Sequence, residues 1–422
     1  MLTLIKNIKK AYGAHEAPLA FLKGKKMAEL PVLEDAYIYI QSGRIAEVGL
    51  MKDLRMLPDI SHIIDASRRI VIPGYVDCHT HLVFGTWRNE EFVDKIKGLS
   101  YQEIAARGGG ILQSAARLGA MSEDQLYELA KSRLQQCIRN GTVGIEIKSG
   151  YGLSLESELK IMRVIKRLKL DSSIPIRSTF LGAHAYPEAY KQDHRTYLAL
   201  LTERIMPIIQ EEELADYCDV FCEDKFFSVE ETDLILEQAT KYGMKPRIHT
   251  NQFTHSGGIG LAIRRNALSV DHLEVLNDEE LNMLSESNTI PVVLPIAAHF
   301  MNLEMPPARN MIDKGLGVAI ATDFNPGTAP SCDMNQAFSL SCIKMRLLPE
   351  EALSGLTINA AYALEWSDQL GSITPGKHAS FLISKPDVDL SYIPYSMSPD
   401  WIDQIYLSEK GSQVVNINQI MN

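Results

Sequence analysis

The sequence has few cysteines and no long apolar run. Its 422 residues include six cysteines, with no C-x-x-C pair among them, so a disulfide framework is excluded and reduced thiols are expected. No stretch approaches the roughly 18 consecutive apolar residues that a membrane helix needs. The beginning of the chain is too polar for a signal peptide. We therefore expect a cytoplasmic protein with no membrane partner.

Positive charge is also scarce. The chain has 42 Lys and Arg residues against 53 Asp and Glu residues, which gives a net charge of −11. This balance argues against nucleic acid as a partner, and an anionic substrate would need a local cation of its own. The length suits a barrel accompanied by a smaller module, and the 45% hydrophobic residues are typical of a soluble globular enzyme.

Strand and helix patterns alternate from residue 71 to about residue 325. Ser122, Ser228 and Asn277 carry the signatures of helix starts between the strands. The strand candidates are residues 71–77, 142–147, 174–181, 217–222, 245–249, 268–272, 290–294 and 317–323. Eight strands, each followed by a helical segment, favour a (β/α)8 barrel, although an open doubly wound sheet would alternate in the same way.

The polar residues at the strand ends favour the closed barrel. They stand at or just after the ends of six candidates: His79, His81, Tyr151, His184, His249, His272 and Asp323. In a barrel these ends meet on one face, which carries the active site, whereas an open sheet would spread them along a line. Four strand ends with histidines and one with an aspartate predict a metal site with catalytic partners.

The segment VIPGYVDCHTH, residues 71–81, is the centre of that prediction. His79 and His81 are two residues apart, so on an extended chain both side chains point to the same side. This arrangement suits two ligands of one divalent cation. The alternative for an isolated H-x-H is one packed and one solvated histidine, because two ligands do not complete a site.

The two ends of the chain resemble each other. Residues 1–70 contain short strand-like runs, and after helical stretches at 333–346 and 349–363 the chain returns to strand-like sequence. We infer that residues 1–70 and 364–422 together form a small composite β-sandwich. It would lie beside a catalytic (β/α)8 barrel built from residues 71–363.

Several motifs resemble the amidohydrolase superfamily and, within it, the imidazolonepropionase family. Arg88, the Y-G-L motif and the D-F-N-P-G motif are the specific features of that family. The motifs are VIPGYVDCHTH (71–81), HLVFGTWRNEEFVDKIKGLSYQEIAARGGGI (81–111), EIKSGYGL (146–153), FLGAHAYP (180–187), HTNQF (249–253), VDHLE (270–274) and ATDFNPGT (321–328). The resemblance covers essentially the whole chain.

The resemblance implies a hydrolase of histidine degradation that converts 4-imidazolone-5-propanoate to N-formimidoyl-L-glutamate. One Zn or Fe ion would activate water and polarise the ring carbonyl. The implied metal ligands are His79, His81, His249 and Asp323. Asp323 and His272 would move the proton of the water, although His272 could instead serve only to orient Asp323.

The resemblance also implies how the substrate is held. Arg88 would bind the propionate carboxylate with its two-pronged guanidinium group. The other implied substrate contacts are Tyr151, His184, Gln252, Asn325, Gly327 and Thr328. Position 252 is Gln where some members of the family carry Glu, which favours binding over catalysis there. His299 follows the seventh strand and stays unassigned.

Two other functions remain open from the sequence. A superfamily deaminase of a purine or pyrimidine base would keep the metal residues but would not need Arg88 and Tyr151 for a carboxylate. A non-catalytic scaffold would typically lose metal ligands, and none is missing. The sequence does not choose between Zn and Fe. We expect a small-molecule substrate and a homodimer, because two-fold pairs are the commonest oligomers.

Overall fold

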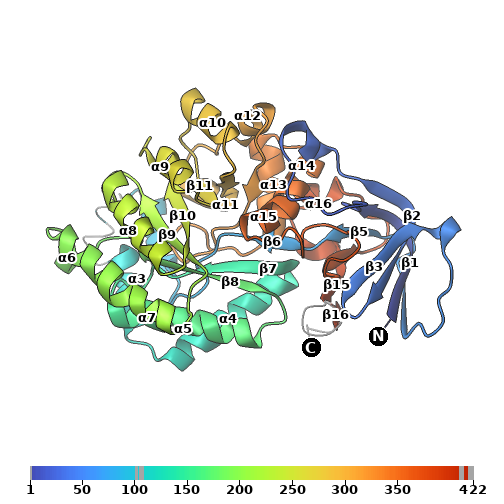
Figure 1. The fold of residues 1–422 in the computed structure, drawn as a ribbon, viewed down its shortest axis with the longest axis horizontal. Helices are drawn as coiled ribbons and strands as arrows, with labels where there is room; N and C mark the ends of the chain where they lie inside the picture. Colours follow the sequence, from blue (N-terminus) through green and yellow to red (C-terminus); the bar gives the residue numbers. More distant parts are fainter. Residues whose placement is uncertain (1, 100–102, 104–108, 408–412, 417–422) are drawn as a thin grey trace.

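A computed structural model of the chain describes residues 2–99, 103, 109–407 and 413–416. Figure 1 shows a barrel surrounded by helices on the left and a separate β-sheet on the right. In the long motif at 81–111, residues 100–102 and 104–108 lie outside the described residues. None of the described helices is both long enough and apolar enough to cross a membrane.

The barrel contains eight parallel strands that pair in chain order. They are β6 (Tyr75–Asp77), β7 (Thr142–Lys148), β8 (Ile176–Ala183), β9 (Tyr217–Cys222), β10 (Lys245–Thr250), β11 (Ser269–His272), β12 (Ile290–Val293) and β13 (Ala319–Ile320). The first and last strands meet just beyond their ends, where Thr80 and Phe324 form a parallel bridge. There the Asp323 amide donates to the His79 carbonyl over 3.0 Å. The predicted (β/α)8 barrel is confirmed.

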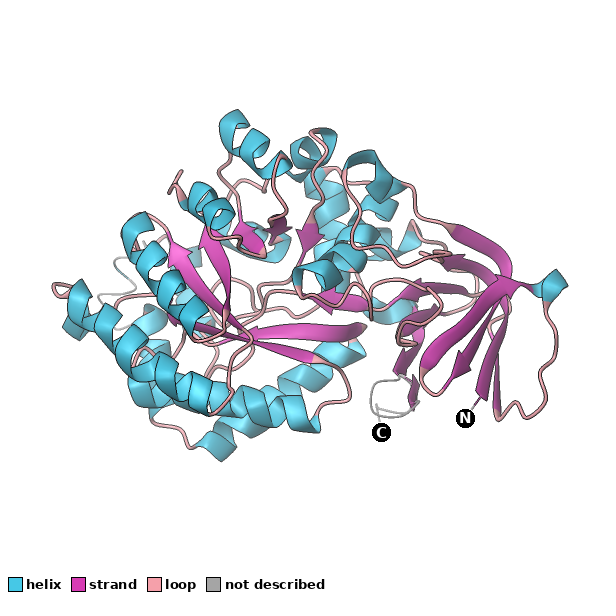
Figure 2. Cartoon of the chain, in the orientation of Figure 1, coloured by secondary structure: helices cyan, strands magenta, loops and turns pink. Residues whose placement is uncertain are grey.

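Helices cover the outside of the barrel, as the cyan ribbons around the magenta strands show in Figure 2. Their bounds are α1 (Asn89–Ile96), α3 (Gly110–Gly119), α4 (Glu123–Arg139), α5 (Leu155–Asp171), α6 (His194–Ala199), α7 (Met206–Glu211), α8 (Val229–Lys241), α9 (Gly258–Arg264), α10 (Asp278–Ser285), α11 (Pro295–Met301), α12 (Ala308–Asp313), α13 (Met334–Met345), α14 (Pro349–Leu356), α15 (Ile358–Ala363) and α16 (Tyr392–Ser396). The helix starts predicted at Ser122, Ser228 and Asn277 are confirmed, since each side chain caps its helix in a reciprocal capping box.

A second sheet, the end sheet, joins the two ends of the chain. It contains β1 (Leu2–Tyr12), β2 (Val32–Gln41), β3 (Arg44–Leu50), β4 (His62–Asp65), β5 (Ile70–Pro73), β14 (Phe381–Ser384), β15 (Ile402–Leu407) and β16 (Gln413–Asn416). The strand β5 lies between β1 and β14, so residues far apart in the chain pair there. Ile38, Val71 and Phe381 belong to its separate core. A second domain built from both ends is confirmed, while its exact residue range stays a prediction.

The strand predicted over residues 71–77 is in fact two strands. Ile70–Pro73 belongs to the end sheet, and Tyr75–Asp77 begins the barrel. Gly74 lies between them, where a Cβ atom would come within 2.9 Å of Val143 Cβ. Pro73 and Gly74 therefore mark the point at which the chain leaves one sheet and enters the other.

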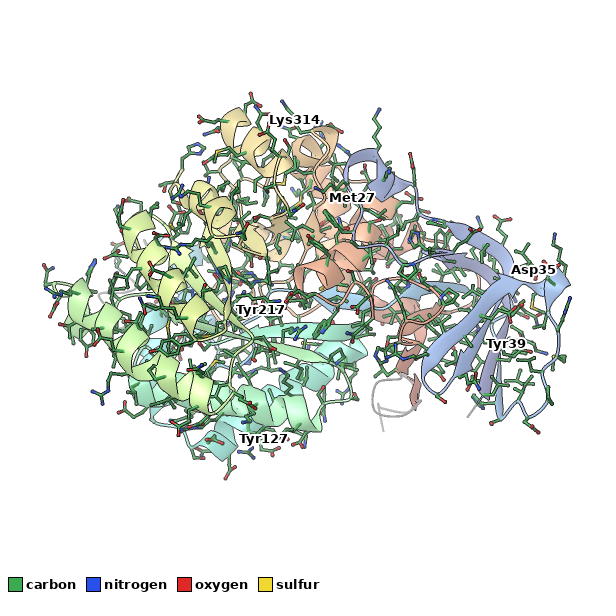
Figure 3. All side chains as sticks on the ribbon, in the orientation of Figure 1. Met27, Asp35, Tyr39, Tyr127, Tyr217 and Lys314 are labelled. Carbon is green, nitrogen blue, oxygen red and sulfur yellow. The ribbon has the colours of Figure 1, made fainter. Side chains whose placement is uncertain are left out.

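One face of the end sheet has a core of its own, whereas the other face packs with the barrel, since Ile72, Leu382 and Ile405 belong to the same buried cluster as the barrel strands. Tyr217, near the middle of Figure 3, lies in the barrel, and Tyr39, toward the right, lies in the end sheet; both are about 1% exposed. The barrel also buries charged side chains of Glu146, Lys148 and Arg247. Because buried charges need partners, these three side chains must be paired with other polar residues inside the barrel.

Candidate active site

Three imidazoles meet at the carboxyl ends of the barrel strands. His79 and His81 follow β6, and His249 lies in β10. Each offers a ligand atom, and the three atoms lie within 4.8 Å of one another. All three side chains are buried. Among the residues that the structure describes, this is the one group of three His, Cys or acidic side chains that could hold a metal ion.

Asp323 lies beside this group, on the segment that follows β13. Its Oδ1 atom is 3.5 Å from Nε2 of both His79 and His81. The backbone of Asp323 has a φ of +56°, a conformation that few residues other than glycine adopt. Such local strain is typical of functional sites, where the surroundings hold a side chain in place. The structure thus brings together three of the four side chains that the resemblance implies as ligands, and it places the fourth, Asp323, against His79 and His81.

The donor set fits a divalent cation. Nε2 of His79 and Nε2 of His249 are buried without a hydrogen-bond partner, a costly arrangement unless something else binds them. Burial is the main cause that holds the pKa of His79, His81 and His249 well below the usual value. All three imidazoles are therefore neutral near pH 7, as metal coordination requires.

Two buried aspartates contact the other nitrogens of these imidazoles. Asp271 Oδ2 lies 2.6 Å from His79 Nδ1, and Asp219 Oδ2 lies 2.9 Å from His249 Nδ1. Lys148 Nζ donates a hydrogen bond to Asp219 Oδ2 over 2.8 Å. Carboxylates placed behind metal-binding histidines fix the orientation of the rings and increase their basicity. The sequence prediction missed both aspartates.

His272 lies next to the imidazole group without belonging to it. Its ring centroid is 5.3 Å from that of His249, its φ is +90°, and its Nδ1 is 3.4 Å from Glu274 Oε1. Burial disfavours the charged form, but the Glu274 carboxylate and then Asp323 raise the pKa of His272 above its usual value. Burial also raises the pKa of Asp323 to about 7. Two side chains that can each carry a proton thus face one site.

Tyr151 and His184 line the side of the site next to His81. The His184 ring stacks on His81 with centroids 5.3 Å apart, and the Tyr151 ring meets both at its edge. Nδ1 of His184 lies 3.1 Å from the Gly150 carbonyl. Burial lowers the pKa of His184 to about 4, so this imidazole is neutral and can hydrogen-bond a neutral ring.

Arg88 precedes α1 and lies against the loop that follows Asp323. Its Nε donates to Glu91 Oε2 over 2.9 Å, and its NH2 donates to the same oxygen. A Cβ atom at Gly327 would overlap NH1 of Arg88 and lie 3.2 Å from its Cζ. Gly327 therefore provides the space in which the guanidinium group lies. Arg88 and Asp323 are linked through one short loop.

The loop after Asp323 is held together by Asn325. The Asn325 Oδ1 atom accepts the amides of Gly327 and Thr328, both over 2.8 Å. Its Nδ2 donates to the Asp323 carbonyl over 2.6 Å and to Thr328 Oγ1 over 2.8 Å. Asn325 thus shapes the loop. Thr328 Oγ1 lies 3.5 Å from Asp323 Oδ2. Thr328 is therefore a more direct candidate than Asn325 for a polar contact with the substrate.

A cavity of about 360 Å³ opens beside Arg88. It is lined by Trp87, Arg88, Phe92, Phe300, Pro326 and Gly327, among others. Neither Gln252, a predicted substrate contact, nor the unassigned His299 lines this cavity. Gln252 is buried with Nε2 3.7 Å from Met301 Sδ. His299 is exposed on α11.

Comparison with known proteins agrees with the geometry of the site. Residues 70–414 match the family model described as Amidohydrolase family. The imidazolonepropionase of Flavobacterium johnsoniae is 46% identical over 409 residues, which cover 96% of this chain and 99% of that one. The chain belongs to the imidazolonepropionase family. The imidazolonepropionase of Christiangramia forsetii is 44% identical, with coverage of 97% and 100%.

Solved structures share the fold at lower identity. An E. coli guanine deaminase has a TM-score of 0.73 and 14% identity, covering 97% of this chain and 98% of its own. A triazine hydrolase variant has a TM-score of 0.75 and 16% identity, covering 100% and 98%. At this identity the likeness supports the barrel and the end sheet and leaves the substrate open.

The imidazolonepropionase-like site contains residues that the sequence prediction missed, and some of them had a visible signal. Asp219 and Asp271 are acidic residues inside otherwise apolar strands, YCDVFC and LSVDH. A charge at such a position needs a partner in the core. Glu91 is three residues after Arg88, the spacing at which helical side chains meet. Glu274 lies two residues after His272 in the VDHLE motif, but it does not interrupt an apolar strand as the two aspartates do.

Proposed function

We propose that this member of the imidazolonepropionase family hydrolyses 4-imidazolone-5-propanoate to N-formimidoyl-L-glutamate. The observation that supports this proposal most strongly is the shared loop at residues 323–328. It carries Asp323 beside His79 and His81 and Gly327 against Arg88. A site for ring-opening chemistry and a cation for a carboxylate thus lie at the two ends of one short segment.

We infer that His79, His81, His249 and Asp323 bind one Zn or Fe ion. When bound, the ion would supply Lewis-acid chemistry, making water more acidic and polarising the ring carbonyl. The buried nitrogens without partners and the neutral imidazoles described above support this assignment. Asp271 and Asp219 would keep two of the rings in the orientation that binding needs.

Arg88 binds the propionate carboxylate in this proposal, and Glu91 fixes the guanidinium group from its other side. Tyr151 and His184 hydrogen-bond the polar edge of the ring, since both side chains lie next to His81. Gln252 and Thr328 offer further amide and hydroxyl contacts. The apolar walls of the cavity beside Arg88 would strengthen its contact with the carboxylate by excluding water.

The proton steps use Asp323 and His272. As water attacks the ring carbonyl, a C–O bond forms and the water loses a proton to Asp323. The C–N bond of the cyclic amide then breaks, and the ring nitrogen leaves with that proton. His272, whose Nδ1 faces Glu274, shares this work as a second group that can take the proton from the water and return it to the ring nitrogen.

We also propose a small-molecule substrate as the natural partner, a homodimer as the assembly and the cytoplasm as the location. Size-exclusion chromatography with light scattering would test the dimer. A mass near twice 47.1 kDa is expected, and a mass near 47 kDa would contradict it.

Substrate choice tests the proposed function directly. The purified protein is incubated separately with imidazolone propanoate, guanine and cytosine, and the products are identified by mass spectrometry. N-formimidoyl-L-glutamate from the first compound alone is expected. Ammonia release from a base without opening of imidazolone propanoate would favour the deaminase. A metal-loaded protein inactive on all three would favour a non-catalytic relative.

A further inference from the structure

One short loop, residues 149–153, contains one member of the site and contacts two others. Tyr151 belongs to it, the Ser149 carbonyl lies 3.4 Å from His81 Nδ1, and the Gly150 carbonyl lies 3.1 Å from His184 Nδ1. We call this segment the Tyr151 loop. Its backbone therefore orients two imidazoles, while its side chain supplies a third ring.

Beyond Ser149, whose amide still donates to the Thr179 carbonyl of β8, strand pairing does not hold the backbone of the Tyr151 loop. Gly150 has a φ of +108° and Leu153 a φ of +53°, both in the left-handed region. A Cβ atom at Gly152 would lie 2.5 Å from the amide nitrogen of Glu158. The loop thus turns tightly against the first turn of α5, and its amides need acceptors there.

Glu158 supplies those acceptors. This side chain lies in the first turn of α5 and has no exposed surface. Its Oε2 accepts the Gly150 amide over 3.1 Å, and its Oε1 accepts the amides of Gly152 and Leu153 over 2.7 and 3.0 Å. One carboxylate therefore binds three amides within four residues, and bonds to a charged acceptor are stronger than neutral ones.

We propose that Glu158 is a positioning residue for substrate binding, acting through the Tyr151 loop. The expected effect of Glu158 on KM rests on the function proposed above. The carboxylate fixes where Tyr151 presents its hydroxyl and where the Ser149 and Gly150 carbonyls meet the two imidazoles. A glutamine at this position would offer one acceptor oxygen in place of two. Its side-chain NH2 group would then face a backbone N–H, and both are donors.

The first test is a double-mutant cycle of Glu158→Gln and Tyr151→Phe. Glu158→Gln is expected to raise KM for imidazolone propanoate about tenfold or more while kcat falls much less, since losing a charged hydrogen bond costs a factor of that order. In the double variant, the increase in KM should be clearly smaller than the product of the increases in the two single variants. Increases that multiply fully would show that Glu158 does not act through Tyr151.

A matched control is Glu351→Gln. Glu351 is also buried in the first turn of a helix, α14, where it accepts the Leu348 amide over 2.8 Å and pairs with Arg309. This variant should lower the unfolding temperature and leave KM unchanged. A general loss of stability would affect both variants alike, whereas a positioning role changes KM in Glu158→Gln alone.

The second test needs no activity. Hydrogen exchange read by mass spectrometry should show faster exchange in a peptide covering residues 149–153 for Glu158→Gln, and no change there for Glu351→Gln. If Glu158→Gln fails to fold, Glu158→Asp keeps the charge and retracts the oxygens, and it should show the same two effects more weakly.

The outcomes separate the two proposals. A wild-type protein that does not hydrolyse imidazolone propanoate, combined with faster loop exchange in Glu158→Gln, rejects the proposed function and retains the loop assignment. An active wild type, with KM and loop exchange both unchanged in folded Glu158→Gln or Glu158→Asp, overturns the role of Glu158.

Discussion

Gly327→Ala tests the placement of Arg88 with a single added methyl group. The new Cβ would overlap Arg88 NH1 and lie 3.2 Å from Cζ. The loop cannot easily retreat, because the Gly327 amide is held by Asn325 Oδ1 over 2.8 Å. Carbon atoms in contact are about 3.5–4.0 Å apart. We therefore expect the guanidinium group to move by on the order of 1 Å.

That displacement has a calculable cost for substrate binding. A charge-assisted hydrogen bond contributes about 1.5–3 kcal/mol, and each 1.4 kcal/mol is a factor of ten, so KM should rise roughly 10- to 150-fold. The value of kcat should change little, because the substituted position does not touch the imidazole group. Steady-state hydrolysis of imidazolone propanoate measures both constants, and elemental analysis checks that metal content is unchanged.

The control for this substitution is Gly119→Ala. A Cβ there would lie at an ordinary 3.5 Å from Ser157 Oγ, so kinetics should match the wild type. If both Gly327→Ala and Arg88→Met have the wild-type KM, Arg88 does not bind the carboxylate. The proposed direction of the substrate in the site is then wrong.

Three further predictions address other parts of the structure. Asp271→Ala should weaken metal binding about 10- to 100-fold, since it removes the partner of His79 Nδ1; equal affinity in competition with a chelator would refute this. Tyr151→Phe should raise KM and spare metal content; an unchanged KM would remove Tyr151 from the substrate contacts. Burial lowers the pKa of Lys377 to about 8, so between about pH 8 and 10 the unfolded chain binds more protons and stability should rise with pH. Lys377→Met should therefore be more stable than wild type at pH 7, by on the order of 1–3 kcal/mol, with a gap in urea unfolding that narrows toward pH 10; a constant gap would contradict the assignment.

The parts of the fold that depend on neighbouring residues were predictable. Ser122, Ser228 and Asn277 cap helices through residues three positions later, so the signal is local. The histidines at the strand ends were recognisable because a barrel sends all such ends to one face. His79 and His81 illustrate this, although they lie in the extended segment beyond β6 and not in the strand itself.

The parts that depend on distant residues were not predictable. Asp271 meets His79 across 192 positions of sequence, and no periodicity records such a pairing. The division of residues 71–77 between two sheets is decided by β1 and β14, which lie far from it in the chain. Glu158 reads from sequence as an ordinary acidic residue in the first turn of a helix, because its three amide partners become visible only when the Tyr151 loop is folded.

Metal content measured together with turnover tests the central assignment most directly. Purified protein should contain about one Zn or Fe ion per chain, lose both metal and hydrolysis of imidazolone propanoate on chelation, and recover both when the ion is returned. His249→Ala should abolish the bound metal without unfolding the chain. Full turnover by protein that elemental analysis shows to be free of metal would contradict the account.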